Sequence, residues 1–432
     1  MYTVDNTVPA IVADFGSHTS KIGYAGEDIP HNIFPSRLGV KEKNGKKVYV
    51  CGGGLDTRRD GLEVVSPFDQ DGLIQNWNDM EKLIDYSVTN IETEDFAFMV
   101  AEPSYNPKDL REKMCELLFE KYQAPAVYLG RSAVLSAFAN NRTTAVVLDC
   151  GACSTTAVPV FEGSLVKNKT LRTMIGGEQL NAKFKEQITE KGIEIKPEYS
   201  VKKTRVNASV EEEQEQEEET GSNDEEAPTR KYEVTDLSFP GTTASYKRYR
   251  QTALLEQSKE ALCKVNDMPS VEPVLQPTEK YELPDGTLIE MGLERQKVPE
   301  TLFNELLLSP VSNDSGVVQQ SGLPPSMAKG LPGMVRDVIQ SCDSQMHKDM
   351  YVGICLTGGT SNFDGLFERL SRELQVLHSK VRVIAAAGKA ERRYCAWTGG
   401  SILATFTEFQ KWWLSKAEYE ENGSGFVHRK CQ

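Results

Sequence analysis

The sequence predicts an α/β protein whose two similar lobes face each other across a cleft. A short apolar run that ends in Asp and is followed by a glycine turn occurs twice, at Asp14 and again 135 residues later at Asp149. That separation is about the length of one domain. A third glycine turn, at Gly358, follows another apolar run and precedes a helical pattern. The chain has 432 residues, of which 39% are hydrophobic, and this is sufficient for two or three packed domains.

The first unit starts with the apolar run Ala10–Ala13, which predicts a buried strand that ends at Asp14. A glycine turn follows, and a second strand starts at Lys21. Such a turn offers backbone N–H groups to an anion, and glycine lets the backbone come close because it has no Cβ. Lys21 adds a point charge beside the turn. The candidate binding residues of this unit are Asp14, Gly16, Ser17, His18, Thr19 and Lys21.

The second unit repeats this order, because the apolar run Ala145–Leu148 predicts a strand that ends at Asp149. Its candidate binding residues are Asp149, Gly151, Ala152, Cys153 and Ser154. Cys150 and Cys153 form a lone C-x-x-C pair, and no second pair follows at the spacing of a zinc site. We interpret this pair as structural, with metal or redox chemistry as the alternative. Nine scattered cysteines fit a reducing compartment.

Asp14 and Asp149 end matching strands, so we expect both carboxylates to face the same place. Two carboxylates beside phosphates suit Mg²⁺, which keeps most of its waters, so both are predicted to hold the metal through water. The alternative is that each Asp merely caps its own turn. Two matched turns together with the Gly358–Gly359 turn favour a nucleotide site.

The third turn follows an apolar run that starts at Ile354. A helix is predicted after this turn, because apolar side chains recur at helical spacing at Leu366, Phe367, Leu370 and Leu374.

The net charge of −14 argues against binding to the DNA backbone, which requires clustered Lys and Arg. It suits a basic partner such as a histone or a basic helix, although an acidic composition by itself also favours solubility. No apolar run approaches the roughly 18 residues that a membrane span requires, and residues 1–9 do not resemble a signal peptide. We therefore expect a soluble intracellular protein without a membrane partner.

Two segments are predicted to be irregular. An insertion at about 198–246 is expected to be disordered, because ten of the sixteen residues in Glu211–Glu226 are acidic and none is basic. The composition of Ser309–Lys329 predicts a second loop. In contrast, an aromatic stripe near the C-terminus is predicted to pack on the core, and consists of Phe406, Phe409, Trp412 and Trp413.

The chain resembles the actin superfamily over nearly its whole length. The segments that carry this resemblance are Asn76–Lys82, Arg111–Met114, Arg142–Thr144, Glu282–Gly286, Pro299–Phe303, Trp397–Ala404 and Val427–Cys431. The resemblance implies a duplicated, ribonuclease-H-like α/β fold of two lobes and four subdomains with a central ATP cleft. The implied boundaries are 1–36, 65–139 and 395–432 for subdomain 1, 37–64 for subdomain 2, 140–175 and 283–394 for subdomain 3, and 176–282 for subdomain 4.

The resemblance also implies that ATP and Mg²⁺ are the cofactors. The first two turns then match phosphate loops, Lys259 and Glu260 match a pair that contacts the adenosine, and Gly358 and Gly359 match glycines beside the adenine and ribose. On a helix, Lys259 and Glu260 would otherwise be interpreted as an ordinary solvated pair. The remaining residues implied to lie near the nucleotide are Gly177, Thr360, Asn362, Phe363 and Arg393.

Four positions depart from the actin pattern. Ser132 stands where actin has a glutamine that positions the attacking water, Ala152 where actin has an aspartate, and Thr156 where actin has a histidine. His18 replaces a glycine of the first phosphate loop. Hydrolysis requires an oriented water and a path for its proton. We therefore expect ATP binding with very slow or absent hydrolysis, and no catalytic residue.

The surfaces that join actin subunits in a filament also look altered. Gly39–Asp60 scarcely matches actin's inserted loop, and Leu306–Leu331 replaces another contact with a longer segment. An open polymer requires both halves of its interface, so we expect a protein that does not form a homopolymer. The alternatives are a cytoskeletal filament protein and a sugar kinase of the same fold. A kinase would need a carboxylate near the phosphate turn, and Thr155–Gly163 offers none beside that turn.

Within the superfamily, the chain resembles the fourth class of nuclear actin-related proteins, which includes the actin-like subunit of animal BAF complexes. The features that carry this are Leu356–Ser361 with the helix after it, the insertion Ala385–Ala390, the second phosphate loop and the acidic insertion. The resemblance implies a nuclear subunit of chromatin-remodelling and histone acetyltransferase complexes, with roles in transcription regulation and DNA repair. Its implied partners are an actin monomer or another actin-related protein, a basic scaffold helix, and histones.

Overall fold

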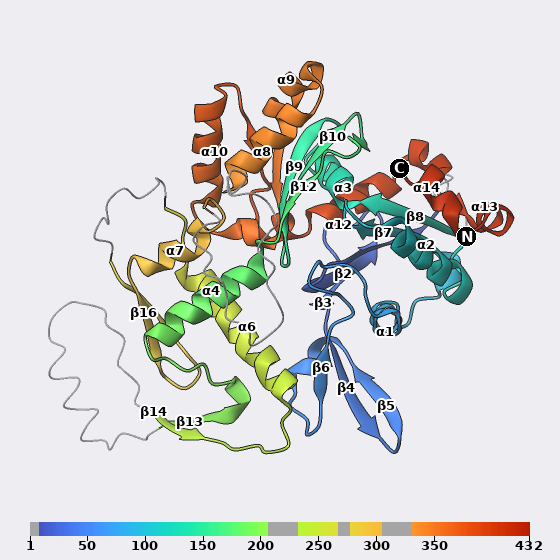
Figure 1. Ribbon diagram of the computed structural model, residues 1–432. Helices are drawn as coiled ribbons and strands as arrows, with labels where there is room; N and C mark the ends of the chain where they lie inside the picture. The colour runs from blue at the N-terminus through green and yellow to red at the C-terminus, as the bar shows by residue number, and fades with distance from the viewer. Residues whose placement is uncertain (1–7, 206–231, 267–276, 305–329) are drawn as a thin grey trace.

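The computed structural model describes residues 8–205, 232–266, 277–304 and 330–432. Two mixed sheets form the centres of two lobes (Figure 1). The first sheet has the order β19-β8-β7-β1-β2-β3. Its strands are β1 (Ala10–Phe15), β2 (Thr19–Tyr24), β3 (Asn32–Pro35), β7 (Ala97–Glu102), β8 (Ala126–Arg131) and β19 (Leu414–Ser415).

The second sheet has the order β11-β10-β9-β17-β18, and β12 also pairs with β10. Its strands are β9 (Ala145–Cys150), β10 (Thr155–Phe161), β11 (Ser164–Leu165), β12 (Leu171–Thr173), β17 (Ile354–Thr357) and β18 (Val383–Ile384). The central strands of both sheets are almost wholly buried, which explains why they are short continuous apolar runs rather than alternating patterns.

The hydrogen-bond registers show that the two sheets repeat one unit. Asp14 lies opposite Lys21 in the β1–β2 hairpin, and Asp149 lies opposite Thr156 in the β9–β10 hairpin, so each turn has four residues. Each hairpin is flanked by a parallel strand, β7 beside β1 and β17 beside β9. The predicted duplicated α/β fold with two lobes is therefore confirmed.

Helices cover both lobes, and two of them connect the lobes. In the first lobe these are α1 (Trp77–Ser87), α2 (Lys108–Glu116), α3 (Ser132–Ala139), α12 (Cys395–Ala404), α13 (Lys416–Asn422) and α14 (Val427–Lys430). The second lobe has α8 (Gly330–Ser341), α9 (Ser344–Val352), α10 (Leu366–Leu377) and α11 (Lys389–Arg393). The chain passes between the lobes through α3 and α12, which pack together where Gly399 lies against the backbone of Leu135. The helix predicted after the third turn is confirmed as α10.

Each lobe carries an extension beyond its sheet (Figure 1). The first extension has β4 (Leu38–Lys43), β5 (Lys46–Val50), the 3₁₀ helix η1 (Gly52–Asp56) and β6 (Glu63–Val65). The second has α4 (Gly177–Glu190), β13 (Val201–Arg205), β14 (Tyr232–Asp236), α6 (Ala244–Leu262), β15 (Glu279–Glu282), β16 (Leu288–Met291) and α7 (Glu294–Glu300). Shorter turns are η2 (Thr93–Asp95), the π-helix η3 (Leu117–Lys121), η4 (Glu198–Ser200), η7 (Gly359–Asn362), η8 (Thr407–Trp412) and η9 (Ser424–Phe426).

The ends of the predicted insertion are ordered, which corrects its boundaries. β13 and β14 pair as an antiparallel ladder from Val201–Asp236 to Arg205–Tyr232. Helix α6 then begins at Ala244, where the side chain of Thr243 caps its first turn. Backbone pairing and capping give these flanks structure that their polar composition did not indicate. The acidic part of the insertion lies outside the described residues, as does the whole of the predicted loop Ser309–Lys329.

The C-terminal aromatic stripe is only half packed. Phe409 and Trp413 are buried and contact Tyr128, whereas Phe406 and Trp412 are each nearly half exposed. The prediction was therefore wrong for two of the four side chains, because the 3₁₀ helix η8 turns them away from the sheet. None of the described helices is long and apolar enough to cross a membrane.

Candidate functional site

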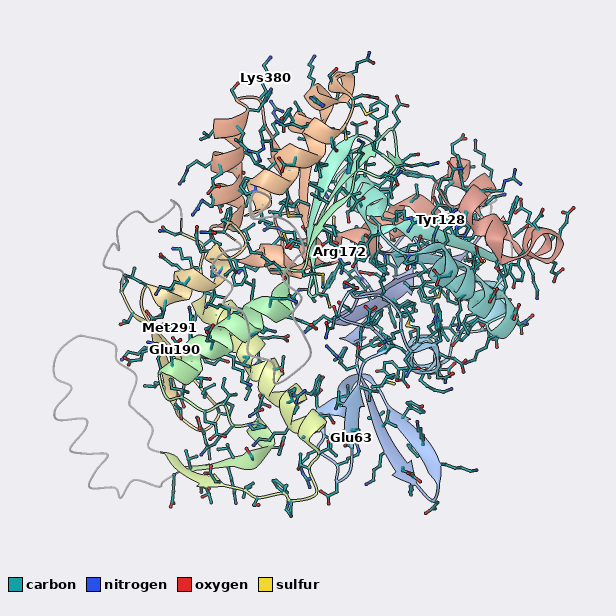
Figure 2. The ribbon with its side chains drawn as sticks, viewed as in Figure 1. Glu63, Tyr128, Arg172, Glu190, Met291 and Lys380 are labelled. Carbon is teal, nitrogen blue, oxygen red and sulfur yellow. The ribbon has the colours of Figure 1, made fainter. Side chains whose placement is uncertain are left out.

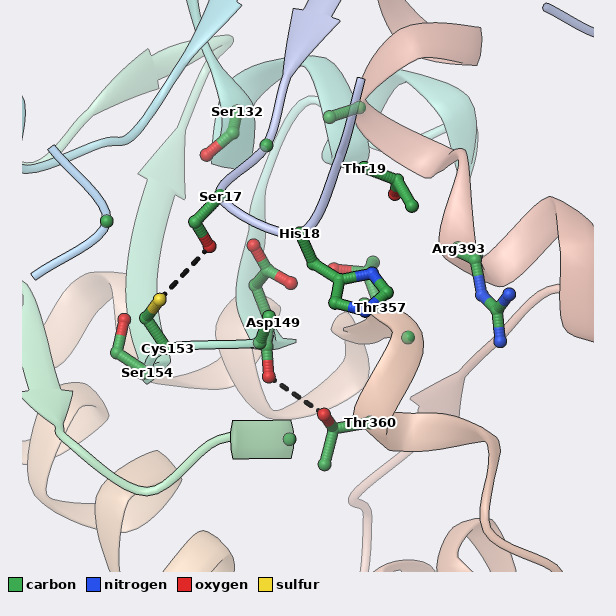
Figure 3. A pocket seen from close by; sticks show the side chains of 18 of the residues that line it. Ser17, His18, Thr19, Ser132, Asp149, Cys153, Ser154, Thr357, Thr360 and Arg393 are labelled. Atoms are coloured by element: carbon green, nitrogen blue, oxygen red, sulfur yellow. Dashed lines mark hydrogen bonds between the residues drawn. The ribbon is translucent and has the colours of Figure 1, made fainter. Parts of the chain in front are cut away.

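One cleft between the lobes collects all the residues that the sequence singled out. Three turns border it: β1–β2, β9–β10, and the turn after β17 (Figure 3). The predicted residues that line it are Asp14, Gly16, Ser17, His18, Thr19, Lys21, Asp149, Gly151, Ala152, Cys153, Ser154, Gly177, Lys259, Glu260, Gly358, Gly359, Thr360, Asn362, Phe363 and Arg393.

The two hairpin turns have matching geometry. A Cβ added at Gly16 would lie 3.0 Å from the carbonyl oxygen of Thr19, and one added at Gly151 would lie 3.0 Å from that of Ser154. Both contacts are tight, so glycine at each turn keeps the loop closed on itself with its backbone facing the cleft. The Cys153 thiol donates a hydrogen bond to Ser17 Oγ at 3.1 Å, which joins the two turns across the cleft (Figure 3).

The C-x-x-C pair carries no sign of thiol reactivity. Burial raises the pKa of Cys150 well above its ordinary value, and it raises the pKa of Cys153 to about 11. Reactive cysteines require a lowered pKa. The geometry agrees with the structural interpretation of this pair.

The two strand-end carboxylates form an acidic centre at the base of the cleft. Asp14 accepts a hydrogen bond from Lys21 Nζ at 2.9 Å. Burial, and then the negative charge of Asp14, raises the pKa of Asp149 to about 6. Two buried carboxylates that destabilise each other's charge provide a suitable environment for a divalent cation.

In the described part of the chain, no group of three His, Cys, Asp or Glu side chains is placed to hold a metal directly. A cation here would therefore take most of its ligands from water and phosphate, as Mg²⁺ commonly does.

The third turn approaches the second so closely that it requires glycine. Gly358 has φ of 90°, and a Cβ there would lie 2.3 Å from the carbonyl oxygen of Cys150. Thr360 Oγ1 donates to the carbonyl oxygen of Gly151 at 2.8 Å. At Gly176, an added Cβ would lie 2.4 Å from the carbonyl oxygen of Ala152. These contacts fix three backbone segments around one space.

Lys259 is held inside the second lobe. Its ammonium donates to Asn181 Oδ1 at 2.6 Å, and only 6% of the residue is exposed. Burial lowers its pKa, while the charges of Glu256 and Glu260 oppose this shift. Glu260 lies 3.4 Å from Arg393 and is more exposed. Lys259 is therefore not one member of an ordinary solvated pair, because it is buried and oriented at the wall of the cleft.

Sequence reasoning missed a bridge between the lobes. His18 Nε2 lies 3.1 and 3.0 Å from the two carboxylate oxygens of Glu256 on α6. Glu256 also accepts from Asn181 Nδ2 at 2.9 Å. Burial acts to raise the pKa of Glu256, but its bonds and charge interactions with His18, Lys259 and Asn181 lower it overall. The spacing from Glu256 to Lys259 is one helical turn, and that signal could have identified Glu256.

Other lining residues also went unpredicted. Glu178 and Asn181 follow Gly177 on the first turns of α4, so their place beside a glycine turn was a usable signal. The rest come from segments that only the tertiary structure brings to the cleft, and include Ser104, Tyr105, Lys389 and Arg392.

The positions that depart from the actin pattern all face this space. Ser132, Ala152 and Thr156 line the cleft with His18. Ser132 Oγ lies 3.5 Å from Ser104 Oγ, and both are neutral hydroxyls. Of the described residues that line the cleft, His18 is the one histidine, and it is engaged by Glu256. The cleft thus offers backbone N–H groups, hydroxyls, two lysines and two acidic groups, a set that fits a nucleotide polyphosphate with Mg²⁺.

Comparison with known proteins agrees with this architecture. The sequence profile of the actin family matches residues 5–432. The protein called Actin-related protein 4 of Arabidopsis thaliana is 36% identical over 467 aligned residues, which cover all of both chains. Its namesake in Oryza sativa subsp. japonica is 36% identical over 471 residues, again over both full lengths.

A Schizosaccharomyces pombe protein, called SWI/SNF and RSC complexes subunit arp42, is 31% identical over 451 residues. The alignment covers 98% of this chain and 99% of that one. The family match and these full-length relatives agree with the duplicated sheets and the shared cleft, and the chain therefore belongs to the actin family.

Proposed function

We propose that this protein binds ATP with Mg²⁺ in the cleft and uses the nucleotide as a structural ligand that holds the lobes together. The observation that carries this proposal is the convergence of three glycine turns on one space that also holds Asp14, Asp149 and Lys259. In this proposal the turns bind the phosphates, the two carboxylates hold the metal through water, and Lys259 with Glu260 contacts the adenosine. A ligand that binds only the folded state stabilises it by mass action.

We propose further that hydrolysis is very slow or absent. Neutral Ser132, Ala152 and Thr156 line the cleft where the family pattern has groups that organise water. Without a positioned base or an amide to orient the attacking water, the barrier to phosphoryl transfer stays high. His18 does not replace them, since its ring is held by Glu256.

At the level of the cell, we propose a nuclear subunit of a chromatin-remodelling complex, with histone acetyltransferase complexes as a second setting. Support comes from full-length similarity to proteins named Actin-related protein 4 and to a protein named as a subunit of SWI/SNF and RSC complexes. Its proposed partners are an actin monomer or another actin-related protein, paired on a basic scaffold helix, and histones. The net charge of −14 complements such basic partners. We do not expect a homopolymer.

The nucleotide proposal is tested on purified full-length protein that is free of actin. Released nucleotide is identified after denaturation, and phosphate release is followed against actin as the reference. We expect ATP to be recovered and phosphate release to be far slower than for actin. Protein that neither retains nor rebinds ATP would contradict the proposed cofactor, and an actin-like rate would contradict its structural role.

The cellular proposal is tested by affinity purification from nuclear extract with mass spectrometry. Recovery with actin and a remodeller or acetyltransferase scaffold is the expected result. Recovery with cytoskeletal filament proteins alone, or pelleting of the pure protein in polymerising salt, would favour a filament function instead.

A further inference from the structure

The lobes meet a second time at the open end of the cleft, far along the chain from the connecting helices α3 and α12. Residues 52–66 of the first extension contact residues 239–250 of the second, and we call this interface the outer clasp. In Figure 2 the label of Glu63 marks the place where β6 meets the N-terminal end of α6.

Backbone groups form the centre of the outer clasp. The Gly61 N–H donates to the carbonyl oxygen of Gly241 at 2.8 Å. The Tyr246 hydroxyl donates to the carbonyl oxygen of Leu55 at 3.0 Å, and the Tyr246 residue is fully buried. An aromatic side chain buried against the opposite lobe contributes apolar area as well as a hydrogen bond.

The cap of helix α6 takes part as well. The Val64 N–H donates to Ser245 Oγ at 3.0 Å, and Ser245 in turn bonds to Glu63. Thr243, the capping residue, donates its hydroxyl to the carbonyl oxygen of Leu62. The start of α6 is therefore bonded to β6 in the other lobe through several neighbouring groups.

Charged side chains surround this centre. Arg250 Nη1 lies 2.6 Å from Asp56 of the first extension, and Nη2 lies 3.0 Å from Glu198 of its own lobe. The Arg58 guanidinium lies 4.2 Å from the ring centroid of Phe239. Each exposed pair is weak alone, but together with the buried contacts they form a continuous interface.

Helix α6 connects the outer clasp to the nucleotide cleft. Tyr246 lies near its N-terminal end, while Glu256 and Lys259 lie near its C-terminal end and line the cleft. At 1.5 Å per residue, Tyr246 and Lys259 are about 20 Å apart on one rigid element. Separation of the outer clasp would therefore move the helix that also carries the His18–Glu256 bridge.

We propose that the outer clasp holds the lobes closed over the nucleotide, so that the nucleotide leaves or exchanges only when this interface opens. This inference rests on the proposed nucleotide site. A partner that bound residues 52–66 or 239–250 in competition with the opposite lobe would thereby release the ligand.

The first test uses two carboxylates on the same guanidinium. Asp56→Ala removes the interlobe partner of Arg250, and Glu198→Ala removes the partner within its own lobe, so the second is the matched control. An exposed pair of this kind sets an expected two- to fivefold faster release of a fluorescent ATP analogue for D56A, with release from E198A about unchanged. Equal rates in wild type and D56A would contradict the proposal.

The second test closes the interface covalently. A Cβ at Gly241 would lie 2.9 Å from the Cβ of Asp60, so a small separation would allow a disulfide between D60C and G241C. Loaded protein is oxidised, and analogue release is compared before and after reduction of the same sample. We expect release to be lost in the oxidised form and restored on reduction. Unchanged release in the oxidised form would overturn the proposal.

Amide hydrogen exchange at Gly16 and Gly151 provides a readout that needs no ligand. D56A should increase exchange at these turns relative to E198A, and the disulfide should decrease it. If no analogue binds while exchange follows this order, the nucleotide proposal fails and the closing role of the outer clasp stands. If analogue binds while neither exchange nor release responds, the outer clasp proposal fails alone.

Discussion

At the scale of single residues, the interlobe bridge depends on one carboxylate that holds three partners. Glu256 bonds to His18 from the opposite lobe and to Asn181 from α4, and lies near the Lys259 ammonium. Because its pKa is lower in the folded protein than its ordinary value of about 4.5, the ionised form stabilises the fold. That contribution is present above pH 4.5 and is lost as the pH falls through the lowered pKa.

Glu256→Gln should therefore reduce the free energy of unfolding at pH 7 by about 1–3 kcal/mol, the range for hydrogen bonds to charged groups. The gap between wild type and variant should shrink below about pH 4, where wild-type Glu256 is also neutral. Urea unfolding at both pH values measures this. Glu260→Gln is the control, since Glu260 is exposed and its pair with Arg393 is long, at 3.4 Å. A gap independent of pH would contradict the assignment.

Gly358 makes the tightest backbone approach at the third turn. Gly358→Ala places a Cβ 2.3 Å from the carbonyl oxygen of Cys150, at φ of 90°. We expect a loss of more than about 2 kcal/mol in stability and loss of ATP-analogue binding. Thermal unfolding and fluorescence titration measure the two effects. Gly425→Ala, whose nearest heavy atom is 3.9 Å away, should leave both near wild type.

At the scale of elements, the packing of α3 against α12 determines how the lobes are joined. Gly399 on α12 lies so close to α3 that a Cβ would lie 1.8 Å from the carbonyl oxygen of Leu135. The neighbouring Trp397 is fully buried and donates its Nε1–H to the carbonyl oxygen of Val12 at 2.9 Å. A single helix thus packs on β1, which leads into the first turn, and on the helix that leads to the second lobe.

Gly399→Ala should force these helices apart and reduce stability by more than about 3 kcal/mol, or prevent folding. Gly400→Ala on the same helix is the matched control. Its Cβ would meet side chains of Val12 and Met99 at 3.0 and 3.2 Å, and side chains can shift where a carbonyl cannot. Soluble yield and denaturant midpoints compare the two. Equal effects would show that the close helix approach is unimportant.

At the scale of the whole molecule, charge is distributed unevenly along the chain. The net charge is −14, and Glu211–Glu226 alone contains ten acidic residues and no basic one. This segment lies between the β13–β14 hairpin strands, at the end of the second lobe away from the cleft. Its charge can therefore influence basic partners without disturbing the nucleotide site.

Deletion of 211–226 should leave ATP-analogue affinity unchanged and weaken binding to histones at least severalfold at low salt. The dependence of histone binding on salt should also decrease, because fewer charges take part. Binding titrations at 50 and 200 mM salt test this. A variant in which the ten acidic residues become Gln or Asn keeps the length and should behave like the deletion. Unchanged histone binding in both would rule out a role for this charge.

The sequence by itself determined the strands, turns and cleft residues, because each is encoded locally. An apolar run that ends in Asp and a glycine turn specify β1–β2 and β9–β10 without reference to distant residues, and the family resemblance indicated Lys259 and Arg393. Only the tertiary structure decided which side chains meet across the lobes. The His18–Glu256 bridge and the outer clasp join residues far apart in sequence, and no local propensity encodes such a pairing. Phe406 and Trp412 give the same lesson in reverse, since an apolar pattern predicts burial but the surrounding fold decides whether a surface is there to receive it.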